Sequence, residues 1–333
     1  MKKLLAVCFC LTILLSIGCS KEEQPEPVLG NTEDKMIVVG FSQVGAESEW
    51  RVTNTESVKS ALSEENGYVL FFDDARQEQE NQIRAIRMFI QQDVDYIVFS
   101  PKVETGWNSI LMEAKEADIP VIVIDRYIEQ QDEELYTTYI GSDFYKEGEI
   151  AVNWLTDFLK KRGREEEPIR IVHIQGTIGS TPQLGRTAAL EAAIKQNPNW
   201  EMVAQECGDF TKAKAYEVMG SILKQTKDID VVYCENDGEA LGAIAAMEEA
   251  GLKCDPNDGV IVISFDATRL GLEYCLSGKI ALNVECNPLQ GPYIDRIIKK
   301  LERGEPIEKI NYIDETYFEY SKITREIIDK RNY

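Results

Sequence analysis

Short apolar runs alternate with helical patterns along the chain from residue 36 onward. The run over residues 36–41 (MIVVGF) is apolar throughout, which is typical of a strand in a parallel sheet covered on both faces. In the segment 78–92, Ile83, Ile86 and Ile90 are spaced three and four residues apart, so they share one face of a helix. The same two patterns continue to about residue 303 and predict an α/β fold.

The alternation begins anew after the fourth strand, which predicts two doubly wound α/β lobes with a ligand cleft between them. The C-terminal segment 312–333 is aromatic and charged and shows no clear pattern. Strands are predicted at residues 36–41, 68–72, 96–99, 121–124, 139–140, 170–175, 200–205, 231–234, 260–265 and 281–284. Helices are predicted at residues 50–65, 78–92, 107–117, 143–161, 183–196, 211–225, 238–250, 270–277 and 289–303.

The N-terminus has the pattern of an export signal. Lys2 and Lys3 precede an apolar run over residues 4–17, which is short of the roughly 20 residues that a spanning helix needs. We therefore predict a signal peptide over residues 1–18. The small residue before Cys19 resembles a bacterial lipoprotein box and predicts Cys19 as the site of lipid attachment, although an ordinary signal peptide with an incidental cysteine is the alternative. Residues 19–35, which are polar and rich in Pro and Glu, predict a tether.

Composition excludes several classes of function. The 333 residues include 36 basic and 58 acidic side chains, and a net charge of −22 argues against nucleic acid and against basic docking on an anionic membrane. The single histidine rules out a site with several histidine ligands, so no metal is expected. No Gly-rich phosphate loop is present, and no cofactor is expected.

Five cysteines lie in the predicted globular part. They have no C-x-x-C spacing, and an odd number cannot all pair within one chain. Export permits disulfides, but buried thiols with one or two bridges at most are the expected arrangement. The five are Cys207, Cys234, Cys254, Cys275 and Cys286.

Polar planar and aromatic side chains follow many of the predicted strands. Ligands of doubly wound sheets bind outside the carboxyl ends of the strands, so these residues are the candidate site. Asp, Asn and Arg can pair with neighbouring sugar hydroxyls, and aromatic rings can pack on the C–H face of a sugar. The pattern thus favours a small sugar as ligand. The candidates are Glu47, Trp50, Arg51, Asp125, Arg126, Arg186, Phe210, Asn236 and Asp266.

Each candidate also has an interpretation without a ligand. Asp125 and Arg126 could be a helix cap beside an exposed ion pair, and Asn236 or Asp266 could cap the helix that follows it. The two aromatic residues could be core, and Glu47 and its neighbour Glu49 could be solvated. The case for a site rests on the coincidence of so many such residues at strand ends.

Catalysis has weaker support in the sequence. His173 lies inside a predicted strand, where a core histidine is the expected interpretation. Asp125 facing Asp266 could in principle serve as the acid and nucleophile of a glycosidase. A cation next to Asp125 in the chain favours the ionised form of that carboxylate, so no catalytic residue is assigned.

The chain resembles the periplasmic sugar-binding proteins of bacterial ABC importers, in the ribose-binding-like group, and above all its galactofuranose-binding members. The resemblance covers residues 36–333 and is most specific in residues 39–51 (VGFSQVGAESEWR). Supporting motifs are QENQI at 79–83, TGW at 105–107, IDR at 124–126, QGT at 175–177, GDFT at 208–211 and ECNP at 285–288. The chain departs from its relatives at residues 236–238 (NDG for NDD) and 264–267 (SFDA for SIDG).

The resemblance implies a role for each candidate residue. Polar sugar contacts would come from Asp125, Arg126, Arg186, Asn236 and Asp266, and aromatic contacts from Trp50 and Phe210. Glu47 and Arg51 match the contacts that mark the galactofuranose type.

The resemblance also implies an architecture and a biological role. The chain would cross between lobes near residues 139, 285 and 311, giving an N-terminal lobe of residues 36–139 and 286–311 and a C-terminal lobe of residues 140–285 and 312–333. A monomer held by its lipid in the periplasm or on the cell surface would close on a sugar and deliver it to an ABC permease. A sugar-sensing module that signals to a membrane receptor kinase is the alternative, since it would have the same pocket.

Overall fold

The structure is a computed structural model that describes residues 36–129 and 134–333. The predicted signal peptide, the predicted tether and Cys19 lie outside these residues. Within the described ranges, no helix has both the length and the apolar character needed to cross a membrane.

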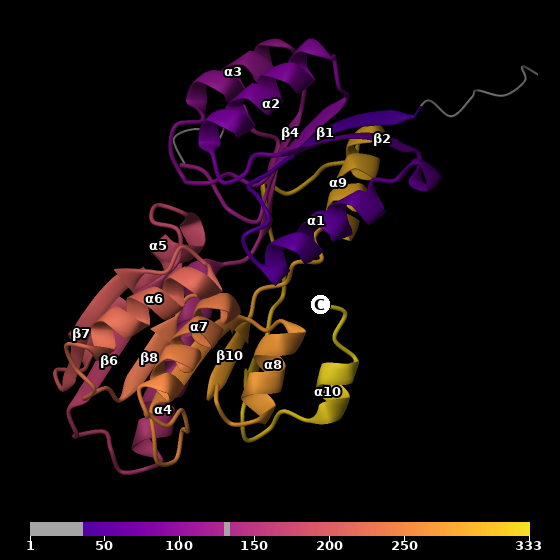
Figure 1. The fold of residues 1–333 in the computed structure, drawn as a ribbon. Helices are drawn as coiled ribbons and strands as arrows, with labels where there is room; N and C mark the ends of the chain where they lie inside the picture. The colour runs from indigo at the N-terminus through magenta and orange to yellow at the C-terminus, as the bar shows by residue number, and fades with distance from the viewer. Residues whose placement is uncertain (1–35, 130–133) are drawn as a thin grey trace, which may run out of the picture. The chain divides into compact units, whose positions relative to one another are not determined.

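The first sheet is built from six parallel strands in the order β11-β5-β4-β3-β1-β2 (Figure 1). Helices α1 (Glu49–Ala61) and α9 (Gly291–Glu302) share one core with this sheet, and α2 (Gln79–Gln91) and α3 (Asn108–Glu116) share a second core. The strands are β1 (Ile37–Gln43), β2 (Tyr68–Asp74), β3 (Tyr96–Phe99), β4 (Val121–Ile124), β5 (Thr138–Gly141) and β11 (Ile310–Tyr312). A short 3-10 turn, η1 (Glu64–Asn66), precedes β2.

The second sheet has the order β12-β10-β9-β8-β6-β7, and only its short edge strand β12 runs antiparallel to its neighbour. Helices α4 (Phe144–Lys160) and α5 (Thr181–Gln196) pack in one core, while α6 (Lys212–Leu223), α7 (Asp237–Glu249), α8 (Arg269–Leu276) and α10 (Arg325–Asp329) pack in the other. The strands are β6 (Ile169–Gln175), β7 (Trp200–Cys207), β8 (Val231–Cys234), β9 (Ile261–Asp266), β10 (Leu282–Glu285) and β12 (Tyr317–Glu319).

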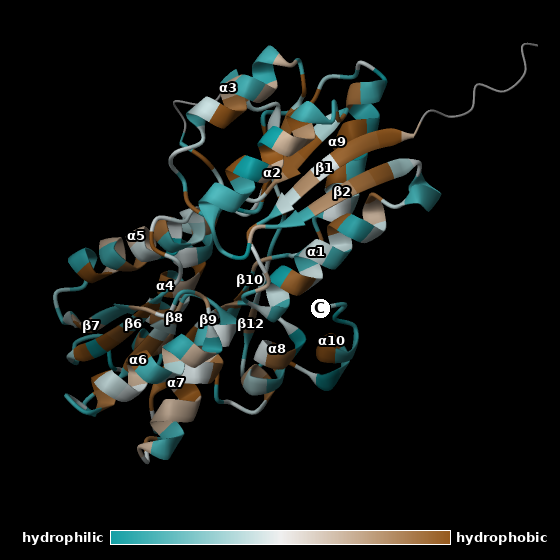
Figure 2. Ribbon diagram, turned by 45° about the horizontal axis from the view of Figure 1, so that its top comes forward, coloured by the Kyte–Doolittle hydropathy of each residue, from teal (hydrophilic) through white to brown (hydrophobic). Residues whose placement is uncertain are grey.

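Central strands are apolar on both sides because each sheet is covered on both faces. In β3, Ile97 and Phe99 belong to one core and Val98 to the other. The strands accordingly stand out as hydrophobic between helices whose outer faces are hydrophilic (Figure 2). This arrangement confirms the predicted fold of two doubly wound α/β units.

The chain passes three times between the two sheets. Strand β5 of the first sheet is followed by α4 and β6 of the second, and β10 of the second sheet is followed by α9 of the first. The last passage leads from β11 to β12. Late segments of the chain therefore complete a sheet that the N-terminal segments begin (Figure 1).

Most of the predicted helices and strands are present, and where their bounds differ from the prediction the cause is local. The strands predicted at 96–99, 121–124 and 231–234 have these bounds in the structure. Helix α5 begins at Thr181, earlier than predicted, because Pro182 fits the first turn of a helix. The helix predicted to reach residue 65 ends at Ala61, and the chain then turns through Gly67, whose φ of 92° suits glycine.

All five cysteines of the globular part are free thiols, so neither of the two bridges that the sequence allowed is present among the described residues. Four of them are buried, and Cys207 is half-buried.

Candidate functional site

All nine candidate residues line one cavity between the carboxyl ends of the two sheets. The space between the lining side chains is about 310 Å³, part of which is open to solvent. Its other lining residues, which the sequence analysis did not select, are Ser48, Phe144, Pro182 and Cys286.

On the side of the first sheet, Arg51 bridges two buried carboxylates. Its Nη1 donates to Asp125 Oδ2 at 2.5 Å, and its Nε donates to Glu47 Oε1 at 2.9 Å. The hydroxyl of Ser100 donates to the same Asp125 oxygen at 2.8 Å. Burial would lower the pKa of Arg51, but the negative charges of Asp125 and Glu47 raise it above its ordinary value.

Arg126 lies beside this group with fewer partners. Its Nη1 donates to the Lys102 carbonyl at 2.8 Å, and its Nη2 lies 3.5 Å from Glu47 Oε1. Burial and the positive charge of Arg51 lower the pKa of Arg126 to about 10. Burial would raise the pKa of Glu47, but the two guanidinium groups lower it. Glu47 Oε2 and Arg126 Nε have no hydrogen-bond partner among the described residues.

Trp50 is both buried and part of the cavity wall. Its Nε1 donates to the carbonyl of Cys286 at 2.7 Å, and its ring packs with Phe144 and Cys286. The guanidinium of Arg51 lies 4.7 Å from the ring centroid, at a cation–π distance. The indole therefore contacts the passage that follows β10.

On the side of the second sheet, Arg186 is held from behind by a carboxylate. Its Nε donates to Glu147 Oε2 at 2.7 Å, and its Nη1 donates to the carbonyl of Glu235. The guanidinium also lies 4.6 Å from the ring centroid of Phe265. Burial would lower the pKa of Arg186, but Glu147 raises it well above its ordinary value.

Phe210 and Asn236 are fixed together by main-chain contacts. The amide of Asn236 donates to the carbonyl of Phe210 at 3.1 Å, and its Oδ1 accepts the Glu239 N–H as the N-cap of α7. Glu239 in turn accepts the N–H of Phe210 at 2.9 Å. The Phe210 ring lies over Gly176, where a Cβ would be 2.0 Å from the ring, so only glycine fits beneath it.

Asp266 is a buried carboxyl of the cavity wall. It is 6% exposed, and no described residue donates a hydrogen bond to its carboxylate. Burial raises the pKa of Asp266 well above its ordinary value, although Arg186 acts in the opposite direction. It does not cap α8, because Thr268 occupies that position.

Three of the lining residues have left-handed backbones although they are not glycine. The φ angles are 57° at Asp125, 59° at Phe210 and 96° at Asp266. Such conformations are uncommon and concentrate at functional sites. They turn the chain sharply at the strand ends, where the side chains meet the cavity.

Several of the interpretations without a ligand are settled by the geometry. Asp125 and Arg126 are buried, so they are not an exposed ion pair, and the partner of Asp125 is Arg51 rather than its neighbour in the chain. Glu49 is exposed as expected, whereas the side chain of Glu47 is buried. His173 is a core histidine, with Nε2 2.9 Å from a carboxylate oxygen of Glu235.

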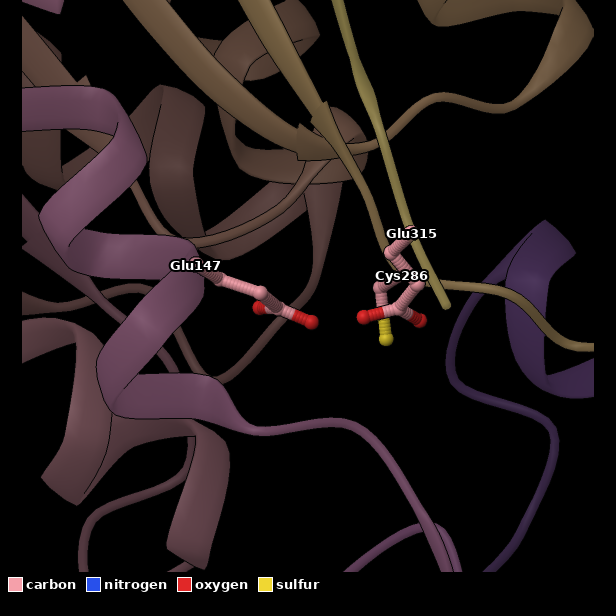
Figure 3. A group of neighbouring side chains, drawn as sticks. All are labelled: Glu147, Cys286 and Glu315. Carbon is pink, nitrogen blue, oxygen red and sulfur yellow. The ribbon is translucent and has the colours of Figure 1, made fainter. Parts of the chain in front are cut away.

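Behind the cavity lies a cluster that the sequence analysis missed. It consists of Glu147, Cys286 and Glu315, the one group among the described residues whose ligand atoms are close enough to hold a metal ion (Figure 3). A signal for Glu147 was present, because it lies three residues after Phe144 and four before Ala151 on the apolar face of α4. A carboxylate on such a face indicates a buried polar contact.

Comparison with known proteins agrees with this architecture. The family described as "Periplasmic binding protein domain" matches residues 39–293. The galactofuranose-binding protein YtfQ of Escherichia coli (strain K12) is 37% identical over 300 residues, which are 89% of this chain and 92% of that protein.

Two solved structures are similar over nearly the same range. One, from Mycobacterium smegmatis in complex with β-D-fucofuranose, has a TM-score of 0.81 and 44% identity, and the match covers 86% of this chain and 92% of the other. The second is the periplasmic binding protein component of the arabinose ABC transporter from Shewanella sp. ANA-3, bound to α- and β-L-arabinofuranose. It has a TM-score of 0.78 and 37% identity, and the match covers 89% of this chain and 99% of the other. The chain therefore belongs to the periplasmic binding protein family, whose members matched here are binding proteins and not enzymes.

Proposed function

We propose that this chain binds a monosaccharide in its furanose form within the cavity and delivers it to an ABC permease. The observation that carries the proposal is the set of buried polar atoms in the wall that lack partners. Glu47 Oε2 and Arg126 Nε have none among the described residues. Buried polar groups are normally paired, so these atoms are suited to sugar hydroxyls.

The names of the similar proteins support the class of ligand and the destination. They specify galactofuranose, β-D-fucofuranose and L-arabinofuranose, and one of them is a component of an ABC transporter. The aromatic rings of Trp50 and Phe210 supply the apolar surface that the C–H groups of such a sugar would contact. No observation favours the receptor-kinase alternative.

We also propose that the two sheets define the two lobes, which close on the sugar. The pairing of β5 continues through Gly141 and that of β11 through Tyr312, which supports crossings after residues 141, 285 and 312. Two of these crossings lie slightly later than the sequence predicts. Residues 1–18 act as signal peptide in this proposal, and Cys19 carries the lipid that holds a monomer in the periplasm or on the cell surface.

A thermal-shift screen tests the proposed ligand. The protein, carrying Cys19→Ala so that it is not lipidated, is heated with galactose, fucose, arabinose, ribose or glucose. A sugar that binds only the folded state raises Tm, and at 100 times Kd the stabilisation is about 2.7 kcal/mol. We expect a selective shift with a sugar that forms a furanose, lost in Asp125→Asn. A Tm that no sugar raises would contradict the proposal.

Membrane fractionation tests the anchor. We expect the full chain to sediment with membranes and to be released by detergent, and the Cys19→Ala variant to remain in the soluble fraction. Equal release of both forms without detergent would contradict lipid attachment at Cys19.

A further inference from the structure

A buried cluster lies where the three passages between the sheets meet. Glu147 extends from α4 toward Cys286, which follows β10, and toward Glu315, which lies between β11 and β12 (Figure 3). The carboxylate oxygens and the sulfur of these residues lie within 4.8 Å of one another. Ser142, which follows β5, donates to Glu315 Oε1 at 2.7 Å and lies 3.4 Å from Cys286 Sγ. Each passage thus contributes a residue to the cluster.

Glu147 connects this cluster to the cavity. Its Oε2 accepts from Arg186, a lining residue, at 2.7 Å, while its Oε1 has no hydrogen-bond partner among the described residues. Its side chain is only 2% exposed. The orientation of the Arg186 guanidinium therefore depends on a carboxylate that also faces the passages.

If both Glu147 and Glu315 were ionised, their negative charges would not be balanced by the surrounding groups. Arg186 is the cation that faces them, and the thiol of Cys286, the carboxyl of Asp266 and the hydroxyl of Tyr139 face the same region. Tyr333 also lies near the thiol. A second unpaired negative charge in such a buried place is strongly disfavoured.

We propose that Glu147 is a positioning residue for Arg186, and that Glu147 and Glu315 together retain one proton, which links the sugar site to the passages between the sheets. This inference deepens the proposed function and rests on it for the identity of the ligand. With one proton, Glu147 keeps its charge for Arg186, and Glu315 remains beside it. Loss of that proton places two negative charges side by side, so that Glu315 and its passage are repelled from α4.

A bound metal is a weaker explanation of the same cluster. One oxygen of Glu147 is already used by Arg186, and Glu315 Oε1 accepts from both Ser142 and the N–H of Asn287, the latter at 2.6 Å. A structural zinc site usually has four ligands, and the cluster offers three. A proton retained on one of the two carboxyls needs no further ligand.

The expected dependence on pH follows from the direction of the pKa shifts. Burial and the neighbouring Glu147 raise the pKa of Glu315 to about 9, and burial raises that of Glu147. An acid with a raised pKa in the folded state stabilises the fold below its unfolded pKa, and this contribution is lost as pH rises to the folded value. We expect Tm to fall as pH rises from about 4.5 to about 9 and then to level off, and sugar affinity to fall near pH 9, where the folded protein loses this proton.

The test compares the full protein with its Glu315→Gln and Glu147→Gln variants, using the sugar that gives the largest thermal shift. Glu315→Gln should bind the sugar with wild-type affinity at neutral pH. The decrease of its Tm and affinity at high pH should be at most half of the decrease in the wild type. Glu147→Gln should weaken binding about tenfold at neutral pH, because Arg186 loses its ionic partner. Glu326→Gln is the control, since Glu326 pairs with Lys330 at the surface. An unchanged pH profile in Glu315→Gln, or unchanged affinity in Glu147→Gln, would overturn the inference.

A second readout does not depend on sugar binding. The infrared band of a protonated carboxyl at neutral pH should be weaker in Glu315→Gln or Glu147→Gln than in the wild type, and unaltered in Glu326→Gln. If no sugar binds but this difference is seen, the proposed function fails and the proton pair stands. Absence of the difference overturns the proton pair. Stoichiometric Co²⁺ binding with a thiolate charge-transfer band that is lost in Cys286→Ser would also overturn it, because the cluster would then be a metal site.

Discussion

The two walls of the cavity keep their charged groups in different ways. In the wall from the first sheet, Arg51 pairs with Glu47 and Asp125, so the groups that face the cavity also hold one another. In the wall from the second sheet, Arg186 donates to Glu147, which lies outside the cavity lining. Asp266 in the same wall is buried, and the described residues donate no hydrogen bond to its carboxylate. In the first wall Arg51 is paired with carboxylates of the wall itself, whereas in the second wall Arg186 is paired with a carboxylate outside the wall.

Because of this difference, substitutions in the two walls should have different effects on the stability of the fold and on sugar affinity. Removing one member of a buried ion pair leaves an uncompensated charge, which is strongly destabilising. Removing a buried carboxylate that has no partner relieves the fold instead, and costs only the contact with a ligand. Substitutions in the first wall should therefore damage both properties, whereas some in the second should damage binding alone.

The largest expected effect is on the first wall. Arg51→Met leaves Glu47 and Asp125 buried without their shared cation and should lower the free energy of unfolding by about 3–5 kcal/mol. Urea unfolding measures the change. Arg87→Met is the control, because the half-exposed pair of Arg87 and Glu113 should contribute about 0–1 kcal/mol. Equal losses in the two variants would mean that the wall is not held by its own charges.

On the second wall, Asp266→Asn should separate the two properties. The raised pKa of Asp266 means that its charged form is disfavoured in the folded protein, so the neutral amide should leave Tm equal or higher at neutral pH. The fall of Tm with rising pH should also be smaller than in the wild type. Sugar affinity should drop about 2- to 10-fold, as for a lost hydrogen bond between neutral groups of about 0.5–1.5 kcal/mol.

The control for this variant is Asp258→Asn, because Asp258 pairs with Lys253 at the surface. It should change neither Tm nor affinity appreciably. A large drop in Tm for Asp266→Asn, measured by calorimetry, would contradict the difference between the walls.

The contact between Phe210 and Gly176 offers a test of the second wall by packing rather than charge. Gly176→Ala places a methyl group against the ring and should cost about 1–3 kcal/mol of stability, with weaker sugar binding. In a Phe210→Ala background the same change should cost much less, because the ring is gone. Additive losses in this double-mutant cycle, measured by urea unfolding, would show that the ring does not lie on Gly176.

The fold was largely predictable because its central strands are apolar on both faces. Strands β3, β4 and β8 have the bounds predicted for them, whereas β11 and β12 were not predicted. These last two strands have three residues each and are exposed or half-buried, so their pairing depends on neighbours that are distant in the chain. The hydrophobic pattern within such a short segment cannot predict which distant strand it pairs with.

The site was predictable in its members but not in its contacts. The rule that ligands bind at strand ends gave a longer set of candidates, and the resemblance to sugar-binding proteins narrowed it to nine residues that share one cavity. It could not assign Arg51 as the partner of Asp125, because the left-handed turn at Asp125 and the packing of α1 determine which guanidinium reaches the carboxylate. The cluster of Glu147 and Glu315 was missed because its members are far apart in the chain and meet only where the passages converge.

The smallest expected effect concerns two helix caps that differ in their distance from the cavity. Asn236 caps α7 and holds the carbonyl of Phe210, whereas Asp143 caps α4 by accepting the N–H of Lys146 at 3.1 Å. Asn236→Ala and Asp143→Ala should each cost about 1 kcal/mol of stability, the usual effect of losing a cap. Only Asn236→Ala should also weaken sugar binding, because it releases Phe210 and removes an amide from the wall. Isothermal titration of both variants checks this, and equal affinities would show that Asn236 acts on the helix and not on the sugar.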